Sequence, residues 1–114
     1  MTKKLLLMLA AAMVAAPAMS APRTARCVVD TIGNATWQGP CRFEAERGGS
    51  FTISPVRGTF AGGITQIGVA IGQPGIAEVR GLTSRGINSR WGIAGRSERD
   101  RACWVGEDFR VCVY

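Results

Sequence analysis

Few side chains in this sequence are of the types that enzymes use for catalysis. The 114 residues include no histidine, which removes Ser-His-Asp and Cys-His catalysis and histidine-based zinc sites. Paired carboxylates could still act as general acid and base, as they do in glycosidases. Glu44 and Glu46 alternate with Phe43 and Ala45 and so share one face of a predicted strand. We expect that face to be solvated, with nothing apolar to raise one pKa, and therefore expect no catalytic site, no cofactor and no enzyme.

The cysteines are better placed for disulfides than for a metal site. Cys27, Cys41, Cys103 and Cys112 lack the paired C-x-x-C spacing of a zinc site, so we expect no bound metal. Four cysteines in an oxidising compartment predict two disulfides, with three possible pairings. We favour Cys27–Cys41 and Cys103–Cys112, because a turn centred on 107–108 would make the latter two cross-strand neighbours. The crossed pairings remain open at this point.

Arginine is the residue type that most suggests a binding function. The net charge is +6 at pH 7, and every basic residue after Lys4 is an arginine. A planar guanidinium binds carboxylate and phosphate with two parallel hydrogen bonds, so an anionic partner is one interpretation and a codon bias toward arginine is the other. The candidate binding surface consists of Arg85, Arg90, Trp91, Arg96 and Arg99. The alternating charges of 96–101 also fit a self-neutralising solvated loop, and the tryptophan could instead pack in the core.

The first 20 residues are typical of a secretory signal peptide. Lys3 and Lys4 precede an apolar run from 5 to 16, and small residues follow. The run is shorter than the about 20 apolar residues that cross a bilayer. We expect cleavage after Ser20, with Ala18 or an uncleaved anchor as alternatives. The protein should then be periplasmic or secreted, without a stable membrane anchor.

Residues 21–114 should form a single small all-β domain. No stretch has convincing 3.6-residue periodicity, and glycines recur at about the spacing of strands. We predict a disulfide-linked barrel or sandwich of about six to eight antiparallel strands. The moderate charge, without a basic run, argues against a dedicated nucleic-acid binder.

Hairpins can be predicted from the alternation of apolar residues. An odd-length loop is needed to place Phe51 on the face of Phe43, and we predict a three-residue loop at 48–50. The pairs expected in the next hairpin, which turns at 73–75, are Ile71 with Ala77 and Val69 with Val79. In the last hairpin we expect Trp104 to face the core. Residues 21–26 should be a mobile lead-in, and 87–94 a strand or an irregular turn.

Two segments resemble a group of small exported bacterial proteins with no established activity. They are residues 37–43 with 49–53, and residues 102–112. Similar proteins have a Gly-Pro-Cys turn, a Gly-Ser-Phe-(Ser/Thr)-Ile strand and a final Ala-Cys-Trp-Val…(Arg/Lys)-(Val/Ile)-Cys. Some carry histidines where this sequence has 87–91, so a histidine-dependent role does not transfer. The resemblance implies an exported fold with two disulfides and no particular activity.

These features together indicate an exported, non-enzymatic binding protein of the bacterial cell envelope. Its partner would be another exported protein or an anionic envelope component. Inhibition of a cell-wall hydrolase is one version, because small disulfide-linked β-proteins supply rigid loops. The alternative is a structural or stress-tolerance protein of the envelope without a discrete ligand.

Overall fold

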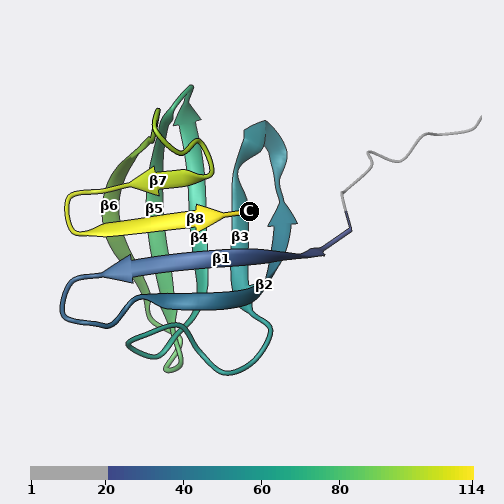
Figure 1. Ribbon diagram of the computed structural model, residues 1–114, viewed down its shortest axis with the longest axis vertical. Coiled ribbons are helices and arrows are strands. Elements are labelled where there is room, and N and C mark those ends of the chain that lie inside the picture. Colours follow the sequence, from purple (N-terminus) through teal and green to yellow (C-terminus); the bar gives the residue numbers. More distant parts are fainter. Residues whose placement is uncertain (1–20) are drawn as a thin grey trace, which may run out of the picture.

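A computed structural model describes residues 21–114, which fold as a closed barrel of eight antiparallel strands (Figure 1). The signal peptide predicted at 1–20 lies outside the described residues. The strands are β1 (Arg23–Thr31), β2 (Trp37–Ala45), β3 (Phe51–Pro55), β4 (Ile64–Gln73), β5 (Ile76–Thr83), β6 (Asn88–Arg96), β7 (Cys103–Val105) and β8 (Phe109–Val113), with one 3-10 turn, η1 (Arg47–Gly49). Within this part of the chain, no helix is long and apolar enough to cross a membrane. The all-β prediction is confirmed.

The interior of the barrel is filled by apolar side chains. Alternate residues of each strand point inward, and the most deeply buried include Ile53, Ile67, Val69, Val79 and Val111, each no more than 1% exposed. An eight-stranded barrel has an interior just wide enough for such side chains. The barrel therefore has a packed core, and a ligand could enter only at an end or bind outside.

The two ends of the barrel are built differently. At one end, which we call the closed end, Trp37 packs edge-on against Phe60 with ring centroids 4.7 Å apart. The closed end carries the loops 32–36, 56–63, 84–87 and 106–108. The other end, which we call the mouth end, carries the loops 46–50, 74–75 and 97–102, together with the first residues of β1 and the last of β8.

Both favoured disulfides are confirmed, and they occupy opposite sides of the barrel wall. Cys27–Cys41 joins β1 to β2 inside the core, with both residues 0% exposed. Cys103–Cys112 joins β7 to β8 on the outside, where it packs with Val28. The two outer cysteines are direct cross-strand partners, as the predicted turn required.

The central hairpin has the predicted register, whereas in the hairpin before it the turn lies one residue earlier than predicted and the pairing shifts by two residues. Ile71 pairs with Ala77 and Val69 with Val79, as predicted. The loop predicted at 48–50 is wrong, because the chain turns at 47–49 and the amide of Glu46 donates to the carbonyl of Ser50 at 2.7 Å. Both glycines of the turn take positive φ angles. Ser50 is extended, and its Oγ accepts a hydrogen bond from the amide of Ile71 at 2.8 Å.

Two local expectations need correction. Residues 21–26 are not a mobile lead-in, since β1 already pairs with β2 at Arg23. Gly39-Pro40 is not a turn but part of β2, opposite Cys27 and Arg26. The segment 87–94, predicted as a strand or an irregular turn, is a strand from Asn88 onward, with a bulge at Trp91. In both corrected segments, backbone pairing with a neighbouring strand outweighs a weak local preference.

Candidate functional site

The five residues of the sequence-predicted surface do not form one face. Arg85 lies in the turn between β5 and β6 at the closed end, and Arg90 follows near the start of β6. Arg96 ends the same strand at the mouth end, and Arg99 lies in the next loop. Six residues of strand separate the two arginines of β6 by about 20 Å. Arg96 and Arg99 therefore lie at the mouth end, away from the other three residues, but only Arg96 lines the depression at the mouth.

Trp91 belongs to the barrel packing and does not stand free as a binding platform. A Cβ built on Gly81 would lie 2.7 Å from three atoms of the indole, so the ring covers that glycine. The ring also packs against Phe109 with centroids 5.6 Å apart. Its neighbour Arg90 is also engaged, with Nε 3.4 Å from Glu78 Oε2.

The mouth of the barrel is the place where unpaired arginines gather. A depression of about 260 Å³ lies there, with Phe43, Phe51 and Trp104 in its apolar floor and Arg23, Arg96 and Arg101 around it. Within residues 21–114 the ion pairs join Glu78 to two arginines and Asp30 to Arg110. None of the three mouth arginines is therefore neutralised by a carboxylate.

Two of these guanidinium groups are positioned by aromatic rings of the floor. The Cζ of Arg23 lies 4.5 Å from the ring centroid of Phe43, and that of Arg96 lies 5.7 Å from the ring of Trp104. The Nε of Arg96 also donates to the carbonyl of Arg101 at 2.8 Å. Stacking and one hydrogen bond hold the group while its terminal nitrogens can still donate to a ligand.

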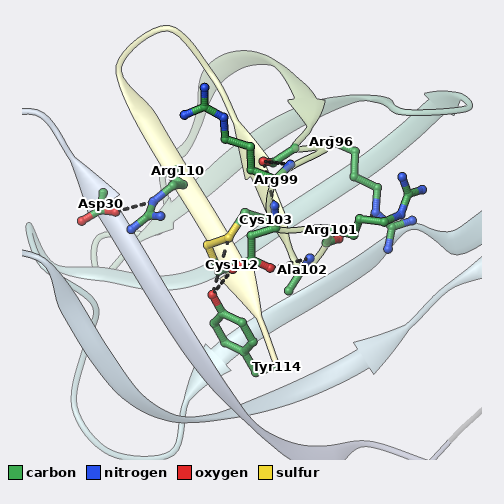
Figure 2. Close-up of a disulfide and its surroundings, with 11 residues drawn as sticks. Asp30, Arg96, Arg99, Arg101, Ala102, Cys103, Arg110, Cys112 and Tyr114 are labelled. Carbon is green, nitrogen blue, oxygen red and sulfur yellow. Dashed lines mark hydrogen bonds and ion pairs between the residues drawn. A yellow bond between two sulfur atoms is a disulfide. The ribbon is translucent and has the colours of Figure 1, made fainter.

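Hydrogen bonds and a neighbouring disulfide hold the loop 97–102, which carries Arg99 and Arg101 (Figure 2). The Oγ of Ser97 accepts from the amides of Arg99 and Asp100, each at 3.2 Å. The carboxylate of Asp100 accepts from the amide of Ala102 at 3.1 Å and from the hydroxyl of Tyr114 at 2.5 Å. The disulfide Cys103–Cys112 closes the base of the loop.

Asp100 bonds to groups of its own loop and to Tyr114, and it forms no ion pair with the mouth arginines. Its hydrogen bond from Tyr114, with that from the amide of Ala102, holds the pKa of the carboxyl below its usual 3.8. The same bond, with desolvation, raises the pKa of the Tyr114 hydroxyl above its usual 10.0. At neutral pH the carboxylate is ionised and the phenol is protonated, so the loop keeps its shape.

Of the other candidate groups, Arg90 and Trp91 line a second depression of about 340 Å³ at the closed end, together with Asp108. Glu44 and Glu46 lie exposed on the outer side of the barrel, as predicted. Among residues 21–114 no three histidine, cysteine or acidic side chains are grouped in a way that could hold a metal ion. The mouth differs from that second depression in having no carboxylate among its lining residues.

Two residues of this site, Arg23 and Arg101, were missed by the sequence analysis. They lie near opposite ends of the described chain and meet because β1 pairs with β8 to close the barrel. Arg101 could have been included with Arg96 and Arg99, since all three belong to one charged run. For Arg23 the sequence carries no signal, because its place depends on a pairing between distant strands.

Fold and site together define a small disulfide-linked antiparallel barrel whose open mouth is apolar within and rimmed by arginines. No family model, curated protein or solved structure matches the chain.

Proposed function

We propose that this chain is an exported, non-enzymatic binding protein of the bacterial cell envelope, and that it recognises an anionic group of its partner at the mouth of the barrel. One observation carries the proposal: Arg23, Arg96 and Arg101 surround an apolar floor without a neutralising carboxylate. The two disulfides and the apolar leader of the sequence are typical of exported proteins.

The chemistry of the mouth indicates the features that a partner must have. Guanidinium groups bind carboxylates and phosphates through paired hydrogen bonds. The floor of Phe43 and Trp104 would favour an apolar group beside the anion. Because the core behind the floor is packed, only a small part of the partner could enter, and the remainder would lie across the rim.

A protein partner is one version of this proposal, and the rigidity of loop 97–102 favours it. A loop already fixed by hydrogen bonds and a disulfide loses little entropy on binding. Glycoside hydrolases carry paired carboxylates in their clefts, which the guanidinium of Arg96 or Arg101 could contact. A cell-wall hydrolase inhibited in this way would be the partner.

The test compares arginines of the two ends. The purified protein is immobilised and exposed to a periplasmic extract, and bound material is quantified by mass spectrometry. We expect one stoichiometric partner, bound about 100-fold more weakly by the double variant Arg96→Gln/Arg101→Gln, since two charge-assisted hydrogen bonds are lost at roughly 1.5 kcal/mol each. Arg57→Gln/Arg85→Gln, which makes the same change of net charge at the closed end, should bind normally.

Two outcomes would contradict the proposal. Equal weakening by both double variants would show that binding depends on net charge and not on the mouth. Diffuse recovery of envelope material, unaffected by either variant, would favour a structural or stress-tolerance protein without a discrete ligand.

A further inference from the structure

The outer wall of the barrel has a hollow of about 230 Å³ over β3, β4, β5 and β6. Its floor is formed by Gly68 and Ala70 of β4. The neighbours of Gly68 along the strand, Ile67 and Val69, point into the core, so a side chain at 68 would point outward. The hollow exists because that side chain is missing.

Neither the backbone nor the packing requires glycine at this position. Gly68 is not among the glycines with positive φ, and an added Cβ would meet no heavy atom within 4 Å. A glycine inside a strand is less stable than alanine by roughly 0.5–1 kcal/mol, and such glycines often mark a close approach by a ligand. Glycine at position 68 thus leaves the hollow open on the outer face of the sheet, although alanine there would make the strand more stable.

The side chain of Arg80, the longest beside the hollow, is held along β5 by an ion pair with Glu78. Arg80 is the cross-strand partner of Gly68. Its Nε and Nη2 lie 3.0 and 2.9 Å from Glu78 Oε1, which lies on the same face of β5 two residues earlier. Arg90 contacts the second oxygen of this carboxylate at 3.4 Å. This network fixes a carboxylate and a guanidinium at the edge of the hollow.

The remaining lining suits a ligand with many hydroxyl groups. Thr52, Gln66 and Asn88 supply hydroxyl and amide groups that both donate and accept hydrogen bonds. Gln66 and Asn88 lie in one row across the sheet, on either side of Leu82, which offers an apolar surface. Nearby charges are balanced, since two carboxylates (Glu46 and Glu78) face two guanidiniums (Arg80 and Arg90). The hollow therefore differs from the cationic mouth.

We propose that this hollow binds a short neutral saccharide, with the sugar ring lying over Gly68 and its hydroxyls bonded to the amides, the carboxylate of Glu78 and the guanidinium of Arg80. This site is on a different face from the mouth and does not depend on the function proposed above.

The test is a titration of isotope-labelled protein with chitotetraose and with maltotetraose, followed by NMR. At least one of these neutral glycans should cause saturable shifts at the amide of Gly68 and at the side-chain amides of Gln66 and Asn88. Gly68→Val should bind it at least ten-fold more weakly, because the new side chain fills the hollow. Gly95→Val should bind normally, since Gly95 is also open on the outer face but lies outside the hollow.

Further variants separate this proposal from the others. The triple variant Arg23→Gln/Arg96→Gln/Arg101→Gln should bind the glycan unchanged, whatever its effect at the mouth. If circular dichroism shows that Gly68→Val does not fold, Asn88→Ala replaces it, because Asn88 is exposed and the substitution should not disturb folding. Asn88→Ala should then bind the glycan more weakly. Absence of saturable shifts with both glycans, shifts centred on the mouth, or full affinity in folded Gly68→Val would overturn the proposal.

Discussion

The contact between Gly81 and Trp91 gives a sharp test of the barrel packing. In Gly81→Ala the new Cβ would lie 2.7 Å from three atoms of the indole, whereas carbon atoms pack at about 3.5–4.0 Å. The ring must therefore withdraw by about 1 Å, and overpacking of this kind costs about 1–3 kcal/mol. Alanine is better than glycine within a strand by about 0.5–1 kcal/mol, so the net loss of unfolding free energy should be about 0–2.5 kcal/mol.

A double-mutant cycle separates this steric effect from an effect on the strand alone. In a Trp91→Leu background the smaller side chain no longer covers position 81, so Gly81→Ala should be neutral or stabilising. The coupling energy should then be about 1–3 kcal/mol. Gly95→Ala is the matched control, because a Cβ at 95 meets nothing within 4 Å.

The measurement is urea unfolding followed by far-ultraviolet circular dichroism, with both disulfides intact. The reasoning would be refuted if Gly81→Ala behaved like Gly95→Ala and the coupling energy were below about 0.5 kcal/mol. Trp91 would then not lie on Gly81 and would be free to act as the exposed binding residue considered in the sequence analysis.

Three further predictions concern the region of the outer disulfide. Replacing Cys103 and Cys112 with alanine should lower the unfolding free energy by about 2.7 kcal/mol in urea titrations, the value for closing so short a loop, and a loss below about 1 kcal/mol would contradict it. The Asp100–Tyr114 hydrogen bond should stabilise the fold between about pH 4 and 10. The pKa of Asp100 is lowered in the folded protein, so this stabilisation is lost as the pH falls through that pKa; the pKa of Tyr114 is raised, so the stabilisation is also lost as the pH rises through that pKa. An ordinary tyrosine pKa in a spectrophotometric titration would refute this. Ser97→Ala should speed hydrogen exchange of the two amides it holds by on the order of ten-fold, and unchanged exchange would show that the loop is held by other contacts.

The parts of the fold that follow from period-two alternation could be predicted from the sequence. The pairs Val69–Val79 and Cys103–Cys112 are of this kind, because each hairpin is local and a slip of one residue would turn its apolar residues to the opposite face. The start of β1 could not be predicted in this way. Its arginines and alanine carry little strand preference, and its ladder depends on β2.

The candidate site was predictable only in part, for a related reason. Arg96 and Arg99 were identified because a charged run is visible in the sequence. The role of Arg23 follows from barrel closure, and the position of Trp91 follows from a bulge in β6. A one-residue bulge changes the face of the sheet on which a side chain lies. The local sequence pattern does not predict this bulge.

The pairing of β1 with β8 also sets the order in which the molecule can fold. Each disulfide lies within a local hairpin, 14 and 9 residues apart in sequence, so both can form while the chain is still open. The ladder between Val28 and Cys112 joins distant strands, and such contacts form slowly because a long loop must be closed first. Until then β1 and β8 each expose an unpaired edge, the feature that promotes aggregation. We expect the meeting of these two strands, after oxidation, to be the slow step of folding.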